Sequence, residues 1–116
     1  MDMAYQGDLI VEPEDFTLEV RRFALMADSL SFHMTGDSVH GPFEIERHIV
    51  KTSDGLFQAL HLPLNYKQYA GKDSATLIFL KINARPRSCI VSGLWKEHGR
   101  EWEFNGTLRK FTSINS

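Results

Sequence analysis

The chain has 116 residues, of which 42% are hydrophobic and 24% are charged, and its formal net charge at pH 7 is -2. This length suits a single domain spanning residues 1–116, and the balanced composition excludes a disordered or fibrous protein. The small negative charge argues against a nucleic-acid partner, because binding to phosphates needs a basic surface.

The basic residues are concentrated near the C-terminal end: residues 81–116 hold seven Lys and Arg against three Asp and Glu, whereas residues 1–80 hold six against twelve. Cysteine is almost absent. Cys89 is the only cysteine, which excludes an internal disulfide and a site made of cysteines alone. The N-terminal stretch MDMAYQGDLIVEPEDF is acidic and has no long apolar run, so we expect neither a secretory signal nor a membrane partner. A cytoplasmic protein is therefore predicted.

Apolar and polar residues alternate with a period of two, which predicts a succession of β-strands. The segments that show this pattern or a short apolar run are FTLEV (16–20), SLSFHMT (29–35), GPFEIERHIV (41–50), LFQALHLPL (56–64), ATLIFLKI (75–82), RSCIVSGLW (87–95) and REWEFNGTLRKF (100–111). The pair Arg21-Arg22 breaks the alternation and predicts a bulge. Asp54-Gly55 and His98-Gly99 are typical of tight hairpin turns.

These signals predict an all-β fold, an antiparallel meander of seven to eight strands that forms a closed or nearly closed small barrel. A barrel removes exposed strand edges, although a two-sheet β-sandwich would give the same alternation. In the last segment Trp102, Phe104 and Leu108 share the inner side. Gly106 lies between them, where a missing side chain indicates a kink or the close approach of another backbone.

No catalytic signature is present, and no catalytic residue is assigned. The five histidines do not form an HxH or HExxH spacing, so neither a metal site nor a cofactor is predicted. GxSxG and the glycine loops that bind phosphate are missing, and Cys89 lies in the apolar run CIV, where a thiol is usually inert. An enzyme, such as a barrel isomerase or cyclase, is the weaker alternative to a binding protein.

Three polar residues occupy positions that the alternation turns inward: Arg47, Gln58 and Ser92. A buried guanidinium without a partner costs several kcal/mol, roughly, so Arg47 must meet a carboxylate, solvent or an anionic ligand. If the three residues converge, they line a ligand-binding pocket with apolar walls. A bulge that turns Arg47 outward, or backbone hydrogen bonds for the other two, is the structural alternative.

The connection over residues 63–74 is longer than the others and contains Tyr66 and Tyr69. It could cover one open end of the barrel as a lid whose tyrosines contact a ligand, or it could be a surface crossover. RSCIVSGLW is apolar on both sides, so a second layer is expected: the N-terminal segment, residues 63–74, or another subunit. The last option predicts a homodimer or another homo-oligomer.

Gly93-x-Trp95 is similar to the short glycine–tryptophan signature of the lipocalin-like and avidin-like barrels. In those families the signature lies near the first strand, whereas here it lies near the end, so the resemblance implies the architecture and no ligand residue. We expect a non-catalytic binding module whose barrel interior takes a small apolar or anionic molecule. The alternative is an interaction or regulatory subunit with a filled barrel that associates through its outer face.

Overall fold

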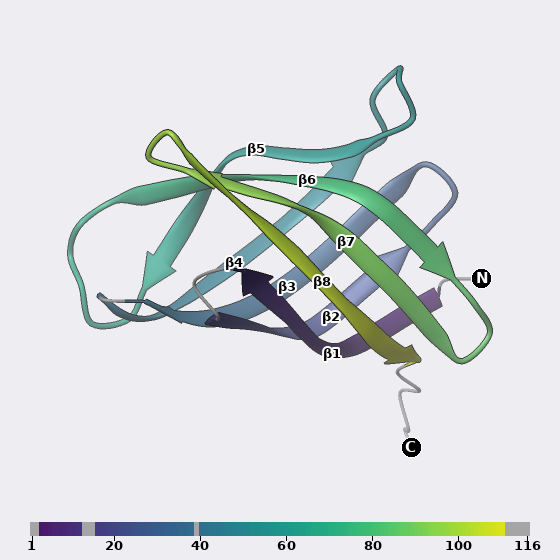
Figure 1. The fold of residues 1–116 in the computed structure, drawn as a ribbon, viewed down its shortest axis with the longest axis horizontal. Helices are drawn as coiled ribbons and strands as arrows, with labels where there is room; N and C mark the ends of the chain where they lie inside the picture. Colours follow the sequence, from purple (N-terminus) through teal and green to yellow (C-terminus); the bar gives the residue numbers. More distant parts are fainter. Residues whose placement is uncertain (1–2, 13–15, 39, 111–116) are drawn as a thin grey trace.

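Eight antiparallel strands form a closed barrel in which each strand pairs with the next along the chain (Figure 1). The structure is a computed structural model that describes residues 3–12, 16–38 and 40–110. The strands are β1 (Met3–Glu12), β2 (Phe16–Leu25), β3 (Ser29–Ser38), β4 (Gly41–Val50), β5 (Phe57–Tyr66), β6 (Asp73–Ala84), β7 (Ser88–Glu97) and β8 (Arg100–Lys110). The predicted barrel is confirmed, and closure removes the sandwich alternative.

Strand β1 closes the barrel by pairing with both β2 and β8. The alternation in the sequence is recognisable only from Phe16 on and predicts at most a covering layer for the N-terminal segment, so the closing role of β1 is not predicted. Tyr5, Leu9 and Val11 are fully buried inside the barrel. Gly7 stands between them at φ 151°, next to a shift in register, and its missing side chain hides the inward pattern in the sequence.

The middle of the barrel is filled by aromatic rings. Phe79 of β6 makes edge-on contacts with Phe23 of β2, Phe32 of β3 and Phe104 of β8, at centroid distances of 5.8, 5.5 and 5.5 Å. All four side chains are buried. Because these rings come from distant points on the wall, they meet across the lumen and divide it into two ends.

Three strands contain irregularities that change which residues point inward. The register of β2 against β3 shifts between Val20 and Arg22, which confirms the bulge predicted at Arg21-Arg22. A second shift lies between Ala59 and Leu62 of β5, where His61 adopts φ 51°. A third shift follows Phe79 in β6. Each extra residue reverses the inside-to-outside parity of the residues beyond it.

The barrel wall is least complete between β4 and β5, whose described pairing is confined to Phe43 with Tyr66 and Glu44 with Asn65. From there the two strands separate toward the β4–β5 loop, which protrudes from the barrel in Figure 1. Gly55 in this loop has φ 81°, as the predicted Asp-Gly turn requires. His98 and Gly99 also have positive φ, so the predicted hairpin turn between β7 and β8 is confirmed.

In an antiparallel meander successive connections alternate between the two ends of the barrel. We call the end that holds the β2–β3, β4–β5 and β6–β7 connections the Lys51 mouth. The opposite end, with the β3–β4, β5–β6 and β7–β8 connections, is the Trp102 mouth. Within the described part of the chain, no helix has the length and hydropathy needed to cross a bilayer.

Candidate functional site

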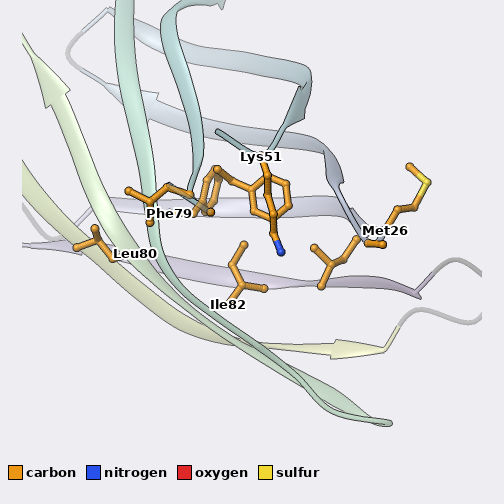
Figure 2. Close-up of a pocket in the computed structure, with 10 residues that line it drawn as sticks. Met26, Lys51, Phe79, Leu80 and Ile82 are labelled. Atoms are coloured by element: carbon orange, nitrogen blue, oxygen red, sulfur yellow. The ribbon is translucent and has the colours of Figure 1, made fainter. Parts of the chain in front are cut away.

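A cavity of about 550 Å³ opens at the Lys51 mouth (Figure 2). Its walls come from the end of β2 and the residues after it, from the β4–β5 loop and from β6. The lining residues are Leu25, Met26, Ala27, Lys51, Gly55, Leu56, Phe57, Phe79, Leu80 and Ile82. The cavity therefore reaches down to Phe79, the ring that fills the centre of the barrel.

The side chains that line this cavity are mostly apolar although they face water, and Lys51 and backbone groups supply the polar part of its walls. Phe57 and Phe79 are buried, whereas Met26 is 37% exposed and Leu80 is 55% exposed. Leu80 points outward by ordinary alternation after the inward Phe79, and the register shift that follows also turns Lys81 outward and returns Ile82 to the inner side. Apolar side chains gathered in a hollow favour an apolar guest, because each Å² removed from water stabilises the complex by about 25 cal/mol.

Lys51 is the one charged side chain among the described residues that line the cavity. Its Nζ lies 5.6 Å from the centre of the Phe57 ring, over the ring face. Figure 2 shows its amine directed into the space between Ile82 and Met26. Among the residues that the structure describes, Lys51 has no ion-pair partner, so its charge is available to a ligand.

The Trp102 mouth holds a second cavity, of about 420 Å³, which is lined by more aromatic and more charged side chains. Its lining residues are Phe16, Asp37, Ser38, His40, Phe43, Leu64, Tyr66, Asp73, Trp95, Glu97, His98, Arg100 and Trp102. Sequence reasoning placed Tyr66 and Tyr69 at one mouth, and the structure brings both to this one. Tyr69 stacks flat on His40 at 4.0 Å, and Tyr66 packs edge-on against Phe43 at 5.7 Å.

Tyr66 is part of a hydrogen-bond chain at this mouth. Its hydroxyl accepts from Ser38 Oγ at 3.3 Å and donates to Asp73 Oδ2 at 3.4 Å. Burial raises the pKa of Tyr66, which keeps the hydroxyl protonated and able to donate. Because Tyr66 ends β5 itself and is tied to its neighbours, it is part of the wall of the mouth.

Two carboxylates and one imidazole converge beside Tyr66. His98 Nε2 lies 3.4 Å from Asp73 Oδ1 and 3.4 Å from Glu97 Oε2, while the indole of Trp95 donates to Glu97 Oε1 at 3.0 Å. One carboxylate oxygen of Asp73, one of Glu97 and one ring nitrogen of His98 lie within 4.8 Å of one another. Sequence reasoning did not single out Asp73 or Glu97, because it did not establish the register of the β6–β7 hairpin, which brings the start of β6 to the end of β7.

The three polar residues predicted to converge inside the barrel do not do so. Gln58 lies on the face opposite to the buried Phe57 and Ala59, so its predicted inward orientation was wrong. The error comes from the register shift after Ala59, since parity counted back from Leu62 and Leu64 assigns Gln58 to the inner face.

Ser92 also points outward. Cys89, Val91, Gly93 and Trp95 are the buried residues of β7, while Ser92 lies half buried on the other face. Because both faces of this strand are apolar, the alternation alone could not tell the inner face from the outer one.

Arg47 keeps the predicted parity but is not enclosed. It pairs with the buried Phe32 and alternates with the buried Ile45 and Ile49, yet its side chain is half exposed. It lies beyond the described pairing of β4 with β5, where the wall is open to water. The guanidinium is therefore accessible to solvent, and Arg47 lines neither of the two mouth cavities.

Cys89 is fully buried, and burial raises the pKa of its thiol to about 11. At neutral pH the sulfur is therefore a protonated thiol inside the core. A buried thiol of this kind is a poor nucleophile, in agreement with the structural role expected from its apolar neighbours.

These observations define the chain as a small up-and-down β-barrel with a filled centre and a hollow at each end. No protein-family model matches the chain, and no curated protein matches it. Among solved structures it is similar to bovine odorant-binding protein complexed with its natural ligand. The TM-score is 0.56 at 9% identity, over 97% of this chain and 72% of that one.

Lobster apocrustacyanin A1 also matches, with a TM-score of 0.36 and 13% identity over 98% of this chain and 61% of that one. At these identities the likeness to the bovine protein shows the fold alone. The architecture that Gly93-x-Trp95 implied is thus found. In the structure Trp95 is buried, and Gly93 lies so close to β6 that a Cβ there would meet the carbonyl oxygen of Ile78.

Proposed function

We propose that the protein binds a small amphipathic anion, such as a medium-chain carboxylate, in the cavity at the Lys51 mouth. The carrying observation is the combination of apolar lining side chains with a single ammonium group that has no ion-pair partner among the described residues. An apolar chain would cover Met26, Leu80 and Ile82, and the anionic head would approach Lys51. Barrels of this shape commonly hold ligands at their mouths, and the likeness to a structure of an odorant-binding protein with its ligand supports the same use.

The two parts of such a ligand contribute unequally. Each methylene group that leaves water contributes about 0.8 kcal/mol, whereas an ion pair at a solvent-exposed lysine contributes about 0 to 1 kcal/mol. The apolar chain therefore supplies most of the affinity, and Lys51 selects the sign of the head group. We expect chain length to change affinity more than head-group charge does.

The test is a calorimetric titration with decanoate, decanol and decylammonium, each below its micelle concentration. Decanoate is expected to bind more tightly than decylammonium, and hexanoate more weakly than decanoate. Leu80→Ala and Leu60→Ala form a matched pair, because both leucines are 55% exposed but only Leu80 lines the cavity.

The lining substitution should weaken decanoate binding by about threefold to tenfold, and the control should leave it unchanged. Absence of saturable binding for every ligand, or equal effects of the two variants, would contradict the proposal.

A second candidate function is self-association through the outer face of β6 and β7. Ile78 of β6 and Leu94 of β7 are directly paired on that face, and both are partly exposed. Apolar residues adjacent on an outer wall favour a covering subunit. Light scattering across a concentration series should show a dimer, and Leu94→Glu should shift it to monomer; a monomer at every concentration would reject this role.

A further inference from the structure

The Trp102 mouth differs chemically from the Lys51 mouth, first because aromatic rings line its cavity. Phe16 contacts Trp95 edge-on at 5.6 Å, and Phe43 lies 6.1 Å from Trp95 and 5.7 Å from Tyr66. Together with Trp102 these rings line the cavity of about 420 Å³. The faces and edges of aromatic rings present partial negative and positive charge, so such a wall can hold a cation against a ring face.

Negative charge is concentrated at the same place. Three carboxylates line the cavity, against one guanidinium, that of Arg100. The carboxylates of Asp73 and Glu97 are well sheltered, with side chains only 16% and 18% exposed. With neutral histidines the lining is therefore net negative, and partial removal from water strengthens its attraction for a cation.

The two sheltered carboxylates are held in fixed orientations. Tyr66 donates to Oδ2 of Asp73, and Trp95 donates to Oε1 of Glu97. The remaining oxygens, Oδ1 and Oε2, both face the imidazole of His98, which sits 66% exposed on the β7–β8 turn. A donor with several N–H groups could use the same two oxygens, because His98 can turn toward solvent.

A cation already lies against one ring of this mouth. The guanidinium carbon of Arg100 is 5.1 Å from the centre of the Trp102 ring. This contact shows that the Trp102 ring can hold a positively charged group against its face, and that Arg100 takes one side of the ring, so a ligand would meet Trp102 from the cavity side.

We propose that the Trp102 mouth is a second binding site, specific for an organic ammonium ion that carries an aromatic or other apolar group. The ammonium would donate to Asp73 and Glu97, while the apolar group would lie among Phe16, Phe43 and Trp102. This site differs from the Lys51 mouth in position and in the charge that it selects, so it does not depend on the function proposed above.

The two tryptophans of the chain both line this cavity, so intrinsic fluorescence reports on it directly. The probe is 2-phenylethylammonium, and 2-phenylethanol is its neutral counterpart of similar shape. We expect a saturable fluorescence change with both compounds and an affinity for the ammonium at least about tenfold higher, since a sheltered ammonium gains both charge-assisted hydrogen bonds and ring contacts.

Substitutions then assign the contacts. Asp73→Asn and Glu97→Gln should each lower the affinity for the ammonium by about threefold to tenfold and leave the affinity for the alcohol unchanged, because the amides keep the shape of the side chain and remove its charge. Glu101→Gln is the matched control: Glu101 belongs to β8 but lies outside the cavity, paired with Lys96 at 3.6 Å. Thermal unfolding verifies that each variant is folded.

Equal affinity for the ammonium and the alcohol would overturn the proposal, as would an ammonium affinity that neither amide substitution changes. Zn²⁺ is titrated separately, because Asp73, Glu97 and His98 could also hold a metal ion. Micromolar Zn²⁺ binding that is lost in His98→Ala, with no ammonium binding in the metal-free protein, would reject the amine site in favour of a metal site.

Discussion

The Nζ atom of Lys51 lies 5.6 Å from the centre of the Phe57 ring, at the edge of an apolar cavity. We predict that Lys51→Met keeps the affinity for decanol and lowers the affinity for decanoate by about twofold to fivefold, since an exposed ion pair contributes little. Lys51→Arg should retain decanoate binding. Calorimetry of both ligands measures the difference, and an equal loss for decanol would show that Lys51 acts through packing instead of charge.

The ring of Phe79 fills the centre of the barrel, whereas the next residue, Leu80, is 55% exposed. Phe79→Ala should lower the free energy of unfolding by about 3 to 5 kcal/mol, because it removes contacts with three rings and leaves a cavity. Leu80→Ala should change it by no more than about 0.5 kcal/mol. Urea denaturation of the two variants compares them directly, and similar midpoints would mean that the centre of the barrel is not tightly packed.

Gly93 on β7 has no room for a side chain. An added Cβ would lie 2.1 Å from the carbonyl oxygen of Ile78 and 2.6 Å from the ring of Phe104. Gly93→Ala must therefore push β7 away from β6, and we predict a loss of more than about 2 kcal/mol or failure to fold.

Gly99 provides the control for this substitution, because it has φ 74° and nothing within 4 Å of an added Cβ. Gly99→Ala should cost only about 1 to 2 kcal/mol, from the left-handed backbone. Thermal unfolding ranks the two variants. A Gly93→Ala protein as stable as Gly99→Ala would show that the strands are less closely apposed than in the structure.

Burial raises the pKa of Cys89 from 9.0 to about 11, which makes stability depend on pH in alkali. Above about pH 9 the unfolded chain releases the thiol proton while the folded chain keeps it, so the folded state binds more protons and stability falls between pH 9 and pH 11. Burial also raises the pKa of Tyr5, so its hydroxyl adds a further loss of stability at higher pH.

Cys89→Ala should flatten the first part of this decline in urea titrations at successive pH values. At pH 8 the native thiol should react with a disulfide reagent far more slowly than the unfolded chain does. Rapid labelling of the native protein, or a pH profile that Cys89→Ala leaves unchanged, would contradict the buried thiol.

The sequence predicts the inner and outer residues correctly in strands that have one buried face and one solvent-exposed face. Leu30, Phe32 and Met34 are buried as their alternation predicted, and so are Phe104 and Leu108 of the last strand. Trp102, on the same inner side, lines the mouth that bears its name. In such strands the periodicity of two follows directly from the pleat, so the sequence carries it without knowledge of the neighbours.

The alternation predicted the wrong orientation, or missed the strand, where a strand contains a bulge, an inward glycine or two apolar faces. An extra residue after Ala59 reversed the parity of Gln58, and the two apolar faces of β7 concealed the direction of Ser92. Gly7 concealed β1, because a glycine on the inner face looks like an interruption. A bulge is a local choice of backbone that tertiary packing makes, so alternation cannot locate it reliably.

The sequence by itself determined that the chain is a small all-β meander with aromatic residues inside, because burial of alternate side chains is a local property of each strand. Only the tertiary structure decided which side chains share a mouth. The register of β6 against β7 brings Asp73 beside Glu97, and the β4–β5 loop and β6 place Lys51 and Ile82 in one cavity, although the members of each pair are far apart along the chain. The physical reason is that a binding site depends on distances across the barrel, which are fixed by register and closure and leave no periodic trace in the sequence.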